Sequence, residues 1–155
     1  MKSGGKLRKA RGFDVWLQVG RTNIKVHQVL NMMLDKVDLS LAQHEILINI
    51  RNNSGLTQKQ LSDQLLVVKS NVTALIQKLE ARGLVRRTPD PDDTRKKCLA
   101  LTARGEALVQ KSFALQNRVV TAMTSVMSDK ELEQMVDIMA RVGEAVDVFR
   151  AANSR

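Results

Sequence analysis

Between positions 69 and 78 the sequence brings together amide, hydroxyl and amine side chains at spacings that place them on one side of a helix. The amides of Asn71 and Gln77 can each form two hydrogen bonds with an adenine edge. The hydroxyls of Ser70 and Thr73 can bond phosphates or base edges. This chemistry suits a helix in the major groove of DNA; the alternative is an ordinary solvated helix face. The candidate DNA-contacting residues of this helix are Lys69, Ser70, Asn71, Thr73, Gln77 and Lys78.

A second group of basic residues follows in a segment whose apolar pattern changes to a period of two. Residues 84–88 and 96–101 are predicted to be short antiparallel strands, joined by a polar loop over 89–95. Arg95, near the loop tip, can enter a narrow minor groove, and Asp93 can brace it by a charge-assisted hydrogen bond. Alternatively, the two form only a surface ion pair. The candidate DNA-contacting residues of this hairpin are Arg86, Arg87, Asp93, Arg95, Lys96 and Lys97.

The helix that carries the first group also has an apolar side, which sets its orientation. Its apolar residues recur at i, i+3, i+4 and i+7, and they are Val72, Leu75, Ile76 and Leu79. We expect this side to be buried. The helix is expected to have about 14 residues and to end before Gly83, because glycine is a common C-terminal cap.

Three further helices begin with the capping-box pattern, in which two residues satisfy each other's free backbone groups. The pairs are Ser40 with Gln43, Thr57 with Gln60, and Ser128 with Glu131. The helix from Thr57, the next helix up to Gly83 and the turn between them match a helix-turn-helix. With the hairpin directly after it, the sequence predicts a mainly α, winged helix-turn-helix fold of the α+β type.

Long helical patterns flank this core, over about residues 14–35 and over residues 102–155. The first is apolar on more than one side, which is typical of a helix between two partners. The last helix has apolar residues spaced alternately by three and four, which favours pairing with a second subunit or, alternatively, packing in an intrachain bundle. The candidate dimer-interface residues are Trp16, Leu132, Met135, Met139, Val142, Val146 and Phe149.

The composition limits the partners of the chain. It has 155 residues, 43% of them hydrophobic, and a formal net charge of +9, which favours nucleic acid first and an anionic membrane surface second. No apolar run approaches the length of a membrane span, and no apolar stretch of a signal peptide follows the basic N-terminus. We therefore expect a cytoplasmic protein without a membrane partner.

The sequence gives no indication of an enzyme, a metal site or a cofactor. His27 and His44 are the only histidines and fall on different predicted helices, whereas a metal site needs three or four clustered donors. Either histidine could line a ligand pocket. Cys98 is the only cysteine; it could be a redox switch or, more simply, a small apolar residue packed on the hairpin strand.

Several stretches together resemble the MarR family of bacterial transcriptional regulators. They are Leu56-Thr57-Gln58-Lys59-Gln60-Leu61, Val72-Thr73, Leu79-Glu80-Ala81-Arg82-Gly83-Leu84-Val85-Arg86-Arg87, Asp90-Pro91-Asp92-Asp93-Thr94-Arg95 and Leu101-Thr102-Ala103-Arg104-Gly105. The resemblance runs from about Leu39 to Leu108. It implies a homodimer with interlocked terminal helices and two winged lobes, with Arg95 as the wing-tip arginine and Asp93 as its brace. It also implies a small phenolic or other anionic ligand between the lobe and the dimer helices.

Three positions depart from the family pattern. Leu66 stands where a turn glycine is usual, Val68 where a serine cap is usual, and Ala74 where a basic residue is common. Because valine cannot accept a backbone hydrogen bond, we expect fewer DNA contacts from this helix and more from the wing and the lysines.

The resulting hypothesis has four regions: a disordered basic arm (1–12), an N-terminal dimerisation helix (13–38), a winged DNA-binding lobe (39–101) and C-terminal dimerisation helices (102–155). The expected function is a sequence-specific regulator of transcription, a homodimeric repressor on a pseudo-palindromic DNA site, released by a small aromatic or anionic ligand. The alternative is a winged-helix module that binds proteins. The sequence leaves open the ligand, the DNA site and the target genes, repression against activation, and redox activity of Cys98.

Overall fold

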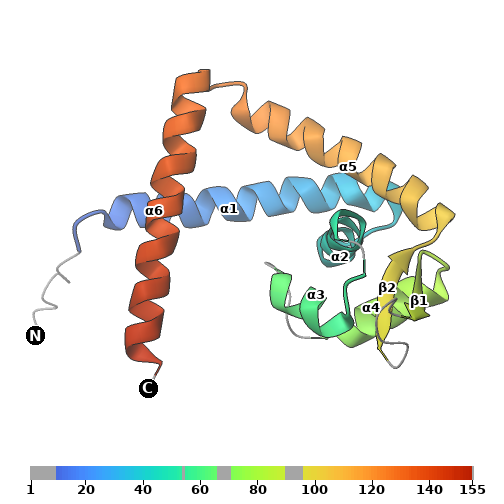
Figure 1. Ribbon diagram of the computed structural model, residues 1–155. Helices are drawn as coiled ribbons and strands as arrows, with labels where there is room; N and C mark the ends of the chain where they lie inside the picture. The colour runs from blue at the N-terminus through green and yellow to red at the C-terminus, as the bar shows by residue number, and fades with distance from the viewer. Residues whose placement is uncertain (1–9, 54, 66–70, 90–95, 155) are drawn as a thin grey trace, which may run out of the picture. The chain divides into compact units, whose positions relative to one another are not determined.

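The computed structural model describes residues 10–53, 55–65, 71–89 and 96–154. Most of the predicted N-terminal arm lies outside this part of the chain, and so do residues 66–70 and 90–95, which include Leu66, Val68, Lys69, Ser70, Asp93 and Arg95. Contacts divide the chain into two compact units, residues 1–117 and residues 118–155. Figure 1 labels the helices and strands of both units, and each unit is described by itself.

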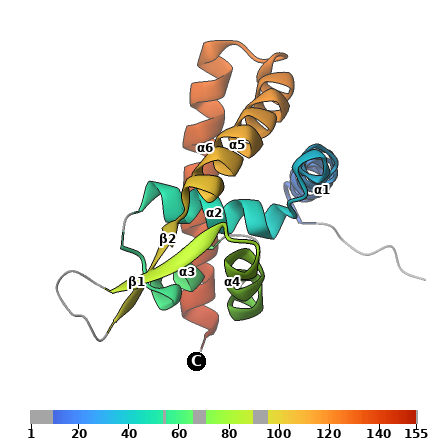
Figure 2. The ribbon, with the colours of Figure 1, turned by 90° about the vertical axis from the view of Figure 1, so that its right-hand side faces the viewer.

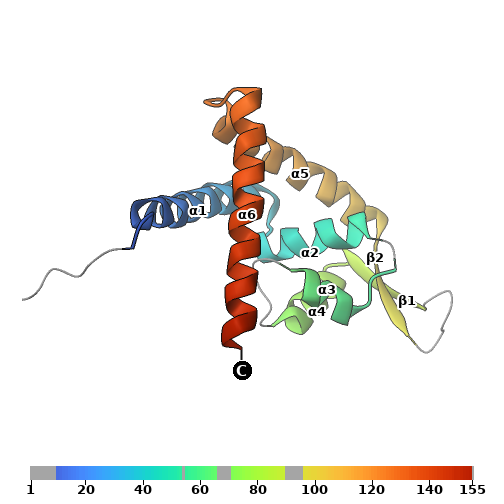
Figure 3. The ribbon, with the colours of Figure 1, turned by 60° about the vertical axis from the view of Figure 1, so that its left-hand side comes forward.

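The first unit is built around helix α2 (Leu41–Asn52), which begins with the predicted capping box of Ser40 and Gln43. Helix α2 contacts α1 (Phe13–Leu34), α3 (Gln58–Gln64), α4 (Val72–Ala81) and strand β2 (Lys97–Leu101). Its apolar residues Ile46, Leu47 and Ile50 are buried. Figure 3 shows α2 beside the shorter α3 and α4. A short 3₁₀ helix, η1 (Asp35–Val37), connects α1 to α2.

Helix α4 is shorter than predicted. It begins at Val72, because Asn71 adopts a left-handed conformation with φ of 74° and no side-chain cap hydrogen bond. Val72, Ile76 and Leu79 are buried as expected, but Leu75 is only half-buried. The end of α4 matches the prediction: Gly83 has φ of 67°, and its N–H donates to the carbonyl of Glu80 at 2.9 Å, which is a Schellman-type cap.

Strands β1 (Val85–Pro89) and β2 form the predicted antiparallel hairpin, in the register Val85 with Leu101 to Pro89 with Lys97. Figure 2 shows the two strands side by side. The Leu99 N–H also donates to the carbonyl of Leu56 at 2.8 Å. The hairpin is therefore fastened to the segment that leads into α3.

Helix α5 (Ala103–Thr124) starts directly after β2. The hydroxyl of Thr102 accepts the Gly105 N–H at 3.0 Å and donates to the carbonyl of Gly83 at 2.7 Å, so Thr102 caps the start of α5. Gly105 lies against the backbone of Leu84 so closely that a Cβ atom would collide with its carbonyl oxygen. The close approach thus joins α5 to the end of α4.

The second unit contains the end of α5 and helix α6 (Asp129–Asn153). The predicted capping box of Ser128 and Glu131 starts α6. None of the residues of α6 is buried. Among the described residues, no helix is long and apolar enough to cross a membrane.

Candidate nucleic-acid interface

The outward side of α4 carries the polar residues that its apolar side predicts. Asn71, Thr73, Gln77 and Lys78 are exposed, while Val72 and Ile76, on the opposite side, are almost fully buried. Asn71 stands at the turn that enters α4 rather than on the helix itself. The arrangement leaves one hydrophilic helix surface over a sealed apolar core, which is what groove binding needs.

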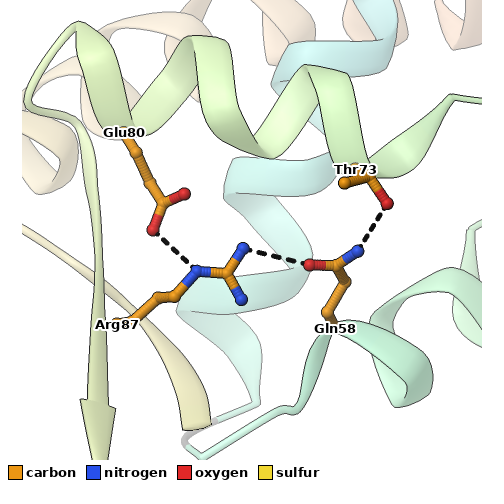
Figure 4. Close-up of polar contacts among 4 residues, drawn as sticks. All are labelled: Gln58, Thr73, Glu80 and Arg87. Atoms are coloured by element: carbon orange, nitrogen blue, oxygen red, sulfur yellow. Dashed lines mark hydrogen bonds and ion pairs between the residues drawn. The ribbon is translucent and has the colours of Figure 1, made fainter.

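A hydrogen-bonded network connects this helix to the hairpin (Figure 4). Gln58, the first residue of α3, donates from Nε2 to the hydroxyl oxygen of Thr73 at 2.6 Å. Arg87 on β1 donates from Nη2 to the Oε1 atom of Gln58 at 3.1 Å. The Nε atom of Arg87 also lies 2.9 Å from a carboxylate oxygen of Glu80 on α4. Three elements therefore share one polar cluster.

This network changes the interpretation of Arg87. The sequence placed its guanidinium among the DNA contacts, but in the structure it binds Glu80 and Gln58. Sequence reasoning missed Gln58 altogether. The available signal was its position directly after the cap Thr57, at the start of the helix that precedes α4.

The hairpin presents further basic side chains. Arg86, Lys96 and Lys97 are exposed on its strands or at their ends. The predicted tip arginine, Arg95, and its brace, Asp93, lie outside the described residues, so their role stays a prediction.

A separate cavity of about 270 Å³ lies within the first unit, next to a buried histidine. The Nε2 atom of His44 lies 2.9 Å from Oε1 of Gln116, and its Nδ1 atom lies 3.1 Å from the Ser112 hydroxyl. Burial lowers the pKa of His44, although the hydrogen bond to Gln116 and the charge of Glu45 oppose the shift. The lining residues are Leu30, Leu41, His44, Glu45, Ile48, Asn49, Gln64 and Gln116.

Cys98 is only 2% exposed, as expected for a cysteine packed as a small apolar residue. Among the residues that the structure describes, no three histidine, cysteine or acidic side chains gather where they could hold a metal ion.

Comparison with known proteins shows which family the central part of the chain resembles. The MarR family model matches residues 37–96, which include the whole of α2 through β1. Over these residues the chain is similar to the MarR family. The MarR-family regulators it resembles include the transcriptional repressor MdtR of Bacillus subtilis, which is 23% identical over 155 residues, all of this chain and 97% of MdtR.

Solved structures of transcriptional regulators share the fold of this chain. CouR from Rhodococcus jostii RHA1 bound to p-coumaroyl-CoA is 25% identical, with a TM-score of 0.76 over 87% of this chain and 95% of CouR. A structure of the repressor CouR bound to a 23-mer DNA duplex is 24% identical, with a TM-score of 0.73 over 92% of this chain and 99% of that one. The winged helix predicted from the sequence is confirmed, and the family consists of transcriptional regulators.

Proposed function

We propose that this chain is a homodimeric repressor of the MarR family that binds double-stranded DNA, with α4 in the major groove and the β1–β2 hairpin against an adjacent minor groove. The observation that carries this proposal is the division of α4 into a buried apolar side and an exposed side with Thr73, Gln77 and Lys78. Gln77 can form paired hydrogen bonds with adenine, and Lys78 can bind a phosphate.

Electrostatics supports the same partner. The chain has 25 lysines and arginines against 16 acidic residues, a net charge of +9. Arg86, Lys96 and Lys97 are exposed on the hairpin next to α4. Basic residues on DNA-binding surfaces displace counterions from the phosphates, which supplies sequence-independent affinity.

Dimerisation is supported by apolar side chains on the terminal helices. On α1, Val15 and Trp16 are 68% and 67% exposed. On α6, the exposed apolar residues recur at the spacing of a helix-pairing seam, and they are Met135, Met139, Val142, Val146 and Phe149. Apolar surface of this extent on a single chain marks an interface. A dimer would place two α4 helices on two half-sites of a pseudo-palindrome.

The cavity beside His44 is the proposed site for a small effector. It combines apolar lining from Leu30, Leu41 and Ile48 with polar atoms from His44 and Gln116, the composition expected of a ligand pocket. Its volume of about 270 Å³ suits a small aromatic acid rather than a large conjugate. The p-coumaroyl-CoA in the CouR structure supports an aromatic, anionic ligand class by analogy.

The DNA-binding proposal is tested by gel shift with the DNA upstream of the chain's own gene. We expect a shift that resists nonspecific competitor and weakens steeply with salt, because counterions are released on binding. A chain that produces no such shift, even at low salt, would contradict the proposal and favour a protein-binding winged module instead.

The effector proposal has a separate test, with benzoate as the probe. Benzoate is expected to raise the melting temperature of the wild-type protein, because binding to the folded state stabilises it. It is also expected to weaken the gel shift, because the proposed effector releases the protein from DNA. Ile48→Trp, which fills the cavity, should abolish both effects. Equal responses of the two proteins would place benzoate elsewhere.

A further inference from the structure

The network around Gln58 does more than hold α4 in place. We propose that Gln58 and Arg87 fix the direction of the hydrogen bonds at Thr73, so that the Thr73 hydroxyl acts as a donor and recognises an acceptor atom on the DNA. This inference rests on the proposed DNA-binding function and adds to it a specificity rule for one residue.

Arg87 determines which atoms of the network donate hydrogen bonds and which accept them. A guanidinium has five N–H donors and no acceptor, and Glu80 holds the Nε side of this one at 2.9 Å. The atom of Gln58 that faces Nη2 of Arg87 at 3.1 Å must therefore be the amide oxygen. Because arginine stays protonated, the orientation of the Gln58 amide is set by its partner.

The orientation of the Gln58 amide also determines which group faces Thr73. With its oxygen turned towards Arg87, Gln58 presents its NH₂ group to the Thr73 hydroxyl oxygen, 2.6 Å away. This contact occupies one lone pair of the hydroxyl, and its single hydrogen cannot point back at a donor. Among the described residues, no acceptor takes the Thr73 hydrogen, and Thr73 is exposed on the outward side of α4. The hydrogen is thus available to the DNA.

The consequence is a restriction on what Thr73 can bind. Acceptors on a duplex are phosphate oxygens, the purine N7 atoms, guanine O6 and thymine O4. An amino group of adenine or cytosine could reach only the remaining lone pair of the hydroxyl and would leave its hydrogen unpaired, so acceptor atoms are favoured over amino groups. Gln58 and Arg87 act through Thr73 and are positioning residues, and the pairing of Arg87 with Glu80 leaves the arginine charge compensated within the protein.

The test reverses the direction of the network. In Gln58→Glu, the carboxylate accepts from Arg87 and can only accept from Thr73, so the Thr73 hydrogen is drawn away from the DNA. Thr73→Val removes the hydroxyl at nearly constant shape. Each variant is expected to weaken binding of the upstream duplex by about three- to tenfold, the worth of one hydrogen bond.

A double-mutant cycle separates this mechanism from simple repulsion by the new charge. If Gln58 acts through Thr73, the double variant should bind no more weakly than the weaker single variant. If the introduced carboxylate only repels phosphates, the two losses should multiply, and the proposal fails. Gln110→Glu, the same change at an exposed position on α5, controls for net charge.

Modified duplexes identify the acceptor. Single 7-deazapurine, 2-aminopurine and 5-methyl-2-pyrimidinone substitutions remove one N7, one guanine O6 and one thymine O4 atom respectively, and single methylphosphonates remove one charged phosphate oxygen each. Wild-type protein should lose affinity at one position where Thr73→Val and Gln58→Glu lose none. A wild-type protein that binds the duplex but shows no such position would overturn this proposal while leaving the DNA-binding function intact; failure to bind any duplex would overturn the function itself.

Discussion

The ring of His44 in α2 is 2.9 Å from the Oε1 atom of Gln116 in α5, a hydrogen bond between residues 72 positions apart. Because Gln116 Oε1 only accepts, Nε2 carries the proton, and Nδ1 lies 3.1 Å from the Ser112 hydroxyl, which donates to the Val109 carbonyl at 3.1 Å. His44 is 3% exposed, so burial disfavours its charged form and lowers its pKa. A neutral histidine thus links α2 to α5.

The lowered pKa of His44 predicts a pH-dependent stability. The unfolded chain, with a histidine pKa of 6.5, takes up a proton before the folded protein as the pH falls. The contribution of His44 to the free energy of unfolding should therefore be fully present above about pH 6.5. It should decrease as the pH falls below this value towards the pKa of the folded state. Urea unfolding between about pH 7.5 and 5.5 measures it. His44→Gln should show a smaller decrease; an unchanged slope would contradict this assignment.

Gly105 is predicted to be essential for packing rather than for helix flexibility. In Gly105→Ala, the new Cβ meets the Leu84 carbonyl oxygen, so α5 must shift against the end of α4. We expect a loss of about 1–3 kcal/mol in unfolding free energy. Urea denaturation measures it directly.

Gly20 in α1 provides the matched control, because a Cβ atom added there would meet nothing within 4 Å beyond the backbone of its own helix. Gly20→Ala should be neutral or stabilising by up to about 1 kcal/mol, since alanine favours a helix. Equal losses of unfolding free energy in Gly20→Ala and Gly105→Ala would mean that the close approach of Gly105 to Leu84 does not contribute to stability.

The proposed seam on α6 can be disrupted with one charge. Val142→Asp is expected to shift the protein from dimer to monomer in light scattering, because an unpaired carboxylate cannot be buried at an interface without a large cost. DNA affinity should fall with it, since two half-sites must be engaged together.

Val148→Asp is the control for that experiment. Val148 is 66% exposed and, six residues further along α6, lies about 120° around the helix from Val142. This variant should remain dimeric. If both variants stay dimeric, or both dissociate, the seam has been placed on the wrong side of α6.

Arg86 should contribute to DNA binding through charge alone. It is exposed on β1, and Arg86→Ala is expected to weaken binding to all duplexes similarly. The slope of log affinity against log salt should fall by about one, because one phosphate is no longer neutralised. Lys130→Ala on α6 removes the same charge far along the sequence from the hairpin and should leave the slope unchanged. If Arg86→Ala binds DNA with the affinity and salt dependence of wild type, Arg86 is not part of the DNA interface.

The parts of the fold that sequence reasoning predicted are those determined by neighbours in the chain. The capping boxes and the end of α4 at Gly83 both depend on residues within a few positions of each other. Amphipathic periodicity also predicted the buried side of α4, apart from Leu75, which lies at the margin of the core.

The missed features depend on contacts that no local pattern records. Gln58 meets Thr73 across 15 positions and Arg87 across 29. The proximity of Gly105 to Leu84 depends on how α5 packs against the end of α4. Basic character alone suggested that Arg87 contacts DNA, and only the three-dimensional position of Glu80 shows where its guanidinium is bound.

The central claim is that the hydrophilic side of α4 discriminates between DNA sequences, and Gln77 tests it most directly. Fluorescence anisotropy should give wild-type protein an affinity at least about 10³-fold higher for the upstream duplex than for a scrambled duplex of equal length. Gln77→Ala should lose about 1–3 kcal/mol on the upstream duplex and nothing on the scrambled one. Equal wild-type affinity for the two duplexes, or a Gln77→Ala variant with undiminished preference, would contradict the claim.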